Sequence, residues 1–126
     1  MILRLFAIAL GGAFGTVMRY YVSKATYRWV DGLFPWGTLA VNLIGCFFVG
    51  FLWEIFDRYT FSPTLKLFVF IGILGGFTTF STYALESMNL ARTGELSLAL
   101  LNVLASTAIG LFLVAFGLFT AKLIVK

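Results

Sequence analysis

The sequence contains no histidine, a single cysteine and two prolines, and 11% of its 126 residues are charged. Soluble domains carry roughly 25% charged residues, so this chain cannot cover a water-exposed surface with polar groups. Cys46 lies in an apolar run without a second cysteine, which excludes both a disulfide framework and CxxC chemistry. A water-soluble domain and a disulfide-rich one are therefore excluded.

Acidic residues are also scarce, and all five lie in expected loops or near the ends of apolar segments: Asp31, Glu54, Asp57, Glu86 and Glu95. Carboxylates at such positions are readily solvated, and we expect Glu86 to be a solvated end residue. Without histidine, a carboxylate pair or a partnered cysteine, nucleophilic, metal-dependent and general acid–base catalysis all lack their groups. We therefore do not expect an enzyme.

Apolar residues make up 61% of the chain before its 13 glycines are counted, and the mean hydropathy is +1.03. Soluble domains reach roughly 45–50% with glycine included, so the chain is predicted to be an integral membrane protein. Its nine lysines and arginines give a net charge of +4 but form no basic patch. That spread is typical of anchors at the bilayer interface rather than of a nucleic-acid-binding surface.

Four apolar stretches are long enough to cross a bilayer, which takes about 20 helical residues. The predicted spans are 3–22, 36–56, 64–88 and 96–124. The connections 23–35, 57–63 and 89–95 are too short for a soluble domain, and no alternating β-barrel pattern is present. We therefore expect one all-α membrane domain over residues 1–126, with Pro63 near the start of the third span.

The lysines and arginines do not determine an orientation in the membrane. One side would carry Arg4, Arg58, Lys66, Lys122 and Lys126, and the other would carry Arg19, Lys24, Arg28 and Arg92. Five charges against four is almost no bias, so the usual positive-inside rule gives no direction. Small chains of this kind can insert both ways and pair as antiparallel dimers. Short loops also leave little room for a pore inside one subunit.

Polar residues at membrane depth are costly and are therefore candidates for function. In the first span Gly11, Gly15 and Arg19 share a helix face, and the glycines form a GxxxG pair that favours close helix packing. In the second span Asn42 shares a face with Thr38, and its amide can donate two hydrogen bonds.

In the fourth span Asn102, Ser106 and Gly110 are spaced by four residues and share a helix face beside Thr107. This pattern favours hydrogen bonding between helices.

The third span is predicted to be broken. Adjacent glycines at 75 and 76 precede four hydroxyl residues within residues 78–82, and both features weaken a helix interior. An interrupted backbone at membrane depth lines a cavity or is buried in protein, and its freed carbonyls can hold a cation. Together with the amide, the aromatic rings and one arginine, this lining suits a small, strongly hydrated anion.

Three stretches together resemble the CrcB/Fluc fluoride channels. Residues 11–20 (GGAFGTVMRY), 37–45 (GTLAVNLIG) and 72–86 (GILGGFTTFSTYALE) are similar, in order, to the motifs of that family's first three spans. The resemblance covers nearly the whole chain. It implies a fluoride-selective channel in the bacterial inner membrane that exports fluoride passively from the cytoplasm.

The family also implies an antiparallel, dual-topology homodimer with a structural sodium ion at its centre. By motif position, the backbone carbonyls of Gly75 and Thr78 would hold the sodium. The residues that would line or lead to the fluoride path are Asn42, Phe80, Tyr83, Ser81, Thr82, Thr38, Thr107 and Arg19.

Two positions depart from the family pattern. Tyr83 stands where the pattern has a second Phe, so it offers a hydroxyl as well as a ring edge. Leu111 stands where the family often has Ser, which leaves Thr107 as the candidate on the fourth span.

Two other functions are compatible with four spans. A small dual-topology multidrug exporter would need an embedded carboxylate in the first span, which contains no acidic residue. A non-transporting assembly subunit would need only the glycine stripes, and it leaves the interrupted third span without a purpose.

Overall fold

A computed structural model describes residues 1–125 and is all-helical over that range. Helices α1 (Ile2–Tyr27), α2 (Trp36–Arg58) and α6 (Leu96–Ile124) are continuous. The third crossing, Pro63–Arg92, is composite and consists of α3 (Pro63–Lys66), the π-helix η1 (Leu67–Leu74), α4 (Gly75–Phe77) and α5 (Phe80–Arg92). Four helical crossings are long and apolar enough to span a membrane, which confirms the predicted all-α, four-span architecture.

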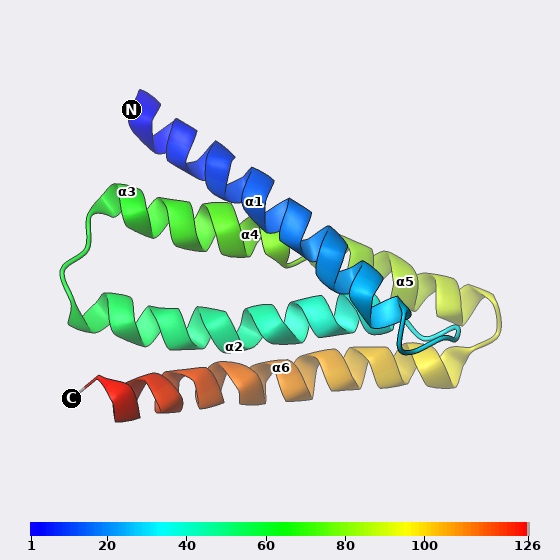
Figure 1. Ribbon diagram of the computed structural model, residues 1–126. Helices are drawn as coiled ribbons and strands as arrows, with labels where there is room; N and C mark the ends of the chain where they lie inside the picture. The colour runs from blue at the N-terminus through cyan, green and yellow to red at the C-terminus, as the bar shows by residue number, and fades with distance from the viewer. Residues whose placement is uncertain (126) are drawn as a thin grey trace.

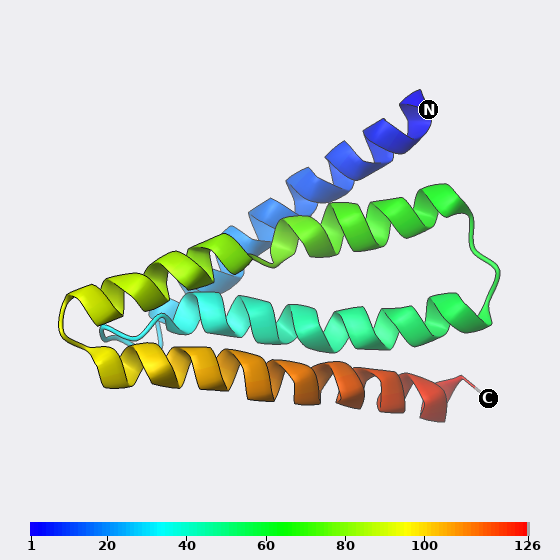
Figure 2. The ribbon, with the colours of Figure 1, turned by 180° about the vertical axis from the view of Figure 1, so that it is seen from behind.

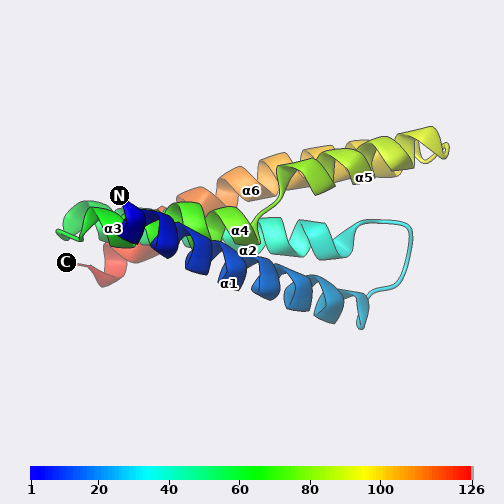
Figure 3. The same ribbon diagram turned by 90° about the horizontal axis from the view of Figure 1, so that it is seen from above.

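The crossings run up and down (Figure 1), with the N-terminus, the α2–α3 connection and the end of α6 at one end of the bundle. The reverse view in Figure 2 shows α2 and α6 side by side along most of their length. The third crossing changes partner at its break: η1 and α4 pack against α1, whereas α5 packs against α6 (Figure 3). The interruption therefore lets one crossing serve two neighbours.

Several helices extend beyond their predicted ends. Helix α1 continues to Tyr27, with Lys24 in its last turn, and α5 continues to Arg92. Basic side chains near a helix C-terminus interact favourably with its dipole, which explains both extensions. Ser62 caps α3 by accepting a 3.2 Å hydrogen bond from the Leu65 amide, and Pro63 occupies the first turn as predicted.

Glycines allow α1 and the third crossing to approach closely. Gly11 and Gly15 of α1 are buried, and a Cβ at Gly11 would lie 2.6 Å from the carbonyl oxygen of Phe68. Across the contact, a Cβ at Gly76 would lie 2.6 Å from the carbonyl oxygen of Gly12. Both helices therefore contribute glycine to one tight crossing, which confirms the packing role predicted for the GxxxG pair.

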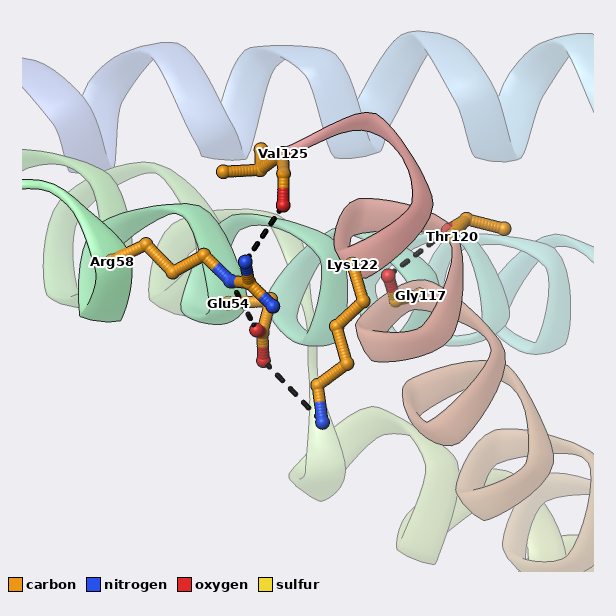
Figure 4. A network of polar contacts seen from close by, with 6 residues as sticks. All are labelled: Glu54, Arg58, Gly117, Thr120, Lys122 and Val125. Atoms are coloured by element: carbon orange, nitrogen blue, oxygen red, sulfur yellow. Dashed lines mark hydrogen bonds and ion pairs between the residues drawn. The ribbon is translucent and has the colours of Figure 1, made fainter.

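Charged groups join α2 to α6 at the end of the bundle that holds the chain termini (Figure 4). The Arg58 guanidinium donates to Glu54 Oε1 at 2.8 Å and to the backbone carbonyl of Val125 at 2.7 Å. Lys122 Nζ lies 4.0 Å from the second oxygen of Glu54, whose side chain is 13% exposed. One carboxylate thus interacts with two cations, and these contacts together with the Arg58–Val125 bond hold the end of α6 against α2.

The tight crossing predicts a contrast between two neighbouring glycines. A Cβ at Gly15 would overlap the carbonyl oxygen of Ile73, whereas a Cβ at Gly12 would meet nothing within 4 Å. Gly15→Ala should therefore lower the free energy of unfolding by about 1–3 kcal/mol through overpacking. Gly12→Ala should leave it unchanged or slightly raised, because alanine is the better helix former. Unfolding of the purified protein measures both, and equal effects would contradict the crossing geometry.

Candidate functional site

The third crossing is interrupted at Thr78 and Thr79, where the sequence predicts the break. Thr78 adopts φ −80° and ψ 156°, and Thr79 adopts φ −148° and ψ 114°, so both are extended. The preceding segment, η1, is π-helical, and the amide of Gly75 donates to the carbonyl of Phe70, five residues earlier. π-Helical turns are rare and occur frequently at functional sites.

The side chain of Asn42 on α2 holds the break in place. Its Oδ1 accepts a 2.8 Å hydrogen bond from the Thr79 amide, and its Nδ2 donates a 3.0 Å bond to the Thr79 carbonyl. One amide side chain thus satisfies both backbone groups that an extended residue would otherwise leave unpaired. The sequence left both Asn42 donors available to an anion, and the structure commits one of them to the backbone.

Thr79 also starts the next helix. Its hydroxyl oxygen accepts from the Thr82 amide at 3.3 Å and donates to the Thr82 hydroxyl at 2.9 Å. This is the usual N-cap arrangement for a threonine.

Two backbone carbonyls lose their α-helical partners as a result. In a continuous helix the Thr79 amide would bond to the carbonyl of Gly75, and the Thr82 amide would bond to that of Thr78. Those amides bond instead to Asn42 Oδ1 and to the Thr79 hydroxyl. The two carbonyls that lose their amide partners are those of Gly75 and Thr78, the residues predicted to hold sodium.

A cavity of about 350 Å³, the break cavity, brings four of the predicted residues together: Asn42, Gly75, Thr78 and Phe80. The Phe80 side chain is 80% exposed, and Gly75 is also exposed. A Cβ at Gly45 would overlap the methyl group of Thr78, so glycine at that position lets the break approach α2.

A second cavity of about 490 Å³, the polar cavity, shares Thr79 with the break cavity as a lining residue. It contains three further predicted residues, Arg19, Thr38 and Thr82. Lys24 of α1 also lines it, with its ammonium 5.7 Å from the centre of the Tyr20 ring. This cavity therefore presents two cations and several hydroxyl groups.

Glu86 is the functional candidate that the sequence did not identify. It lines the polar cavity, its Oε1 accepts a 2.9 Å hydrogen bond from the Thr38 hydroxyl, and its Oε2 is buried without a partner among the residues described. The expectation of a solvated end residue is wrong, because α5 turns this carboxylate toward α2. The sequence did contain a pattern that indicates this position for Glu86. Thr79, Thr82 and Glu86 are spaced by three and then four residues, which places them on one helix face.

The remaining predicted residues lie outside both cavities. Ser81 is exposed on α5, and Tyr83 packs against Phe80 with ring centres 5.5 Å apart. Thr107 is exposed on α6 and does not line either cavity.

On the fourth span, Asn102 is 1% exposed and donates a 2.9 Å hydrogen bond to the Ser87 hydroxyl of α5. This bond confirms the role between helices predicted for that span.

The clamp at the break predicts that Asn42 is required for stability. Asn42→Ala should lower the free energy of unfolding by at least about 2 kcal/mol, because it leaves two backbone groups of Thr79 unpaired. Asn89→Ala removes the same side chain at an exposed position of α5 and should change it by less than about 0.5 kcal/mol. Denaturant unfolding of the purified protein provides the comparison, and a mild effect at Asn42 would show that the bonds are dispensable.

Comparison with known proteins gives a family for this arrangement. The model of the family described as CrcB-like protein, Camphor Resistance (CrcB), matches residues 6–118. Relatives named Fluoride-specific ion channel FluC include one from Parabacteroides distasonis, 46% identical over 98% of this chain and 96% of its own length. Another, from Magnetococcus marinus, is 48% identical over 93% of this chain and 96% of its own.

A third relative with the same name, from Salinibacter ruber, is 49% identical over 91% of this chain and 86% of its own length. The match to the family model includes both cavities, the break and the clamping asparagine. The chain belongs to the CrcB family.

Proposed function

We propose that this protein is a fluoride channel, a multi-pass protein of the bacterial inner membrane that lets fluoride leave the cytoplasm passively. The observation that carries the proposal is the near full-length similarity to relatives named fluoride-specific ion channels. Donors suited to such an ion lie near the break and in the polar cavity. The membrane-spanning lengths of all four crossings support the location.

Fluoride holds its water shell tightly, so a conducting path must replace that shell with other donors. Near the break these are the second N–H of Asn42, the hydroxyls of Ser81 and Thr82, and the electropositive edge of the Phe80 ring. None is a cation, so an ion bound there can still leave, as conduction requires.

The polar cavity is suited to collecting anions from water. Arg19 and Lys24 line it together with one carboxylate, Glu86, which leaves a formal surplus of one positive charge. A surplus of this sign in a cleft raises the local anion concentration. Thr38 holds the Glu86 carboxylate through its hydroxyl, which fixes the position of that negative charge.

The functional unit is proposed to be an antiparallel dual-topology homodimer. The break cavity opens on the protomer surface, where Phe80 is 80% exposed, and a second copy would close it. The almost even distribution of basic residues between the two sides supports insertion in both orientations. Labelling of both chain ends from each face of the membrane tests this assembly, and a single orientation would contradict it.

A structural sodium ion is proposed between the two copies of the break. The carbonyls of Gly75 and Thr78, whose α-helical amide partners are diverted, are the oxygen donors present at this position. Broken membrane helices use unwound carbonyls to coordinate sodium, so the donor set fits. The ion would fix the two breaks relative to each other.

The alternatives account for fewer features. A multidrug exporter of similar size would need a carboxylate on α1, and α1 contains none. An assembly subunit would use the tight α1 crossing but would not need the Asn42 clamp or the two cavities beside it.

The proposed path predicts that the Phe80 ring is required for transport. Liposomes containing the purified protein should release fluoride, and Phe80→Leu should slow release by at least about tenfold, the effect of roughly 1.4 kcal/mol on a barrier. Leucine keeps apolar bulk but removes the electropositive ring edge. Phe6→Leu makes the same change at a position that is 64% exposed, on the N-terminal half of α1, and should leave release unchanged. Absence of release from the unmodified protein would contradict the channel itself.

The proposed sodium site predicts a difference between two residues of the break. Within one protomer a Cβ at Gly75 would meet only the carbonyl oxygen of Phe70, at an ordinary 3.6 Å. A bulky residue there, as in Gly75→Leu, should therefore abolish fluoride release by crowding the ion and the second copy. Thr78→Ser keeps the backbone carbonyl and should be far milder. Indifference to Gly75→Leu would argue against a site built from backbone.

A further inference from the structure

A cavity of about 430 Å³ lies at the end of the bundle that holds the N-terminus and the α2–α3 connection, away from the break. Its walls come from α1, the end of α2, and the α3–η1 segment. Neither the candidate path nor the tight crossing of α1 uses this cavity, which we call the terminal cavity.

The charges that line the terminal cavity are Arg4, Lys66 and Asp57, and all three residues are exposed. Within residues 1–125, neither Arg4 nor Lys66 has a carboxylate within 4.0 Å, and neither side chain donates a hydrogen bond. The nearby cations Arg58 and Lys122 differ, because both interact with Glu54 (Figure 4). The cavity thus has two uncommitted cations, one carboxylate and a formal charge of +1.

The apolar side of the same cavity is aromatic. Phe56, Phe70 and Trp53 line it, with ring centres 5.3 Å apart for Phe56 and Phe70 and 5.6 Å apart for Trp53 and Phe70. Phe56 is 9% exposed, whereas Trp53 is 60% exposed. Partly exposed tryptophan at the end of a span is typical of the bilayer interface.

These features are those of a phospholipid site. The ends of the spans lie at the depth of lipid headgroups, where basic side chains attract anionic lipids. A charged mouth beside an aromatic wall matches a ligand with a phosphate at one end and acyl chains at the other. The surplus charge of +1 balances a headgroup of charge −1.

We propose that the terminal cavity binds one anionic phospholipid of the phosphatidylglycerol type. Arg4 and Lys66 hold the phosphate, the acyl chains lie against Trp53 and Phe70, and the Asp57 carboxylate at the edge of the cavity opposes the negative charge of the headgroup. The site is separate from the proposed transport path and does not depend on which ion crosses.

Phosphatidylethanolamine is the competing occupant, because its ammonium could bind Asp57 while its phosphate binds the two cations. Removal of the Asp57 charge should change the affinity for the two lipids in opposite directions. Removing the Asp57 charge relieves repulsion of an anionic headgroup, whereas it removes a partner from a zwitterionic one.

Native mass spectrometry of the full-length protein measures the affinity for phosphatidylglycerol, phosphatidylethanolamine and phosphatidylcholine. We expect phosphatidylglycerol to bind most tightly. Each basic residue near an anionic lipid contributes about fivefold in affinity, so Arg4→Gln and Lys66→Gln should each weaken phosphatidylglycerol binding about fivefold and together about twenty-five-fold. Asp57→Asn should strengthen phosphatidylglycerol binding about fivefold, because it removes a negative charge near the headgroup.

The matched control is the pair Arg28→Gln and Arg92→Gln, two exposed basic residues at the C-terminal ends of α1 and α5, which lie at the opposite end of the bundle. It removes the same charge and should leave affinity unchanged. Equal weakening by this pair, equal binding of phosphatidylcholine, or weakening by Asp57→Asn would each overturn the proposal. Displacement of the lipid by millimolar glycerol phosphate would assign the site to a soluble phosphate instead. Fluoride transport is not the readout, so failure here is distinct from failure of the proposed channel.

Discussion

The two hydrogen bonds between the Asn42 side chain and the backbone of Thr79 are the interaction on which the rest of the site depends. A break in a helix leaves an amide and a carbonyl without helical partners, and each unpaired group is costly at a buried residue such as Thr79. Asn42 satisfies both from a neighbouring helix. Once they are satisfied, Thr79 can cap α5, and the carbonyls of Gly75 and Thr78 are released from α-helical pairing. The two cavities beside Thr79, the free carbonyls and the change of helix partner along the third crossing all accompany the break that these two bonds stabilise.

The sequence predicted the architecture well because composition determines it. Long apolar stretches have one stable form in a bilayer, and adjacent glycines followed by threonines predict where a helix stops. A break in the third span could therefore be predicted within residues 75–82, and the structure places it at residues 78 and 79. The paired glycines of α1 indicated a close crossing for the same reason, since a missing Cβ is visible in the sequence.

Pairings across the bundle could not be predicted in this way. The partner of Asn42 lies 37 residues away and the partner of Thr38 lies 48 residues away, and nothing in a single sequence specifies either contact. Glu86 was misjudged because distance from the end of a span is a poor guide to solvation when a polar cavity reaches inward. The positions of Phe80 and Gly75, exposed beside a cavity on one protomer, likewise required coordinates.

The separation between Asn42 and Thr79 also has a consequence for biogenesis. Synthesis proceeds from the N-terminus, so Asn42 is made 37 residues before Thr79, the residue with which it pairs. The principal packing partner of α2 is α6, which is made last of all. The Asn42 side chain can therefore form its two bonds only once the third span is in place. The contacts of α2 with the break and with α6 thus form after the later spans are made, whereas its contact with α1 can form earlier.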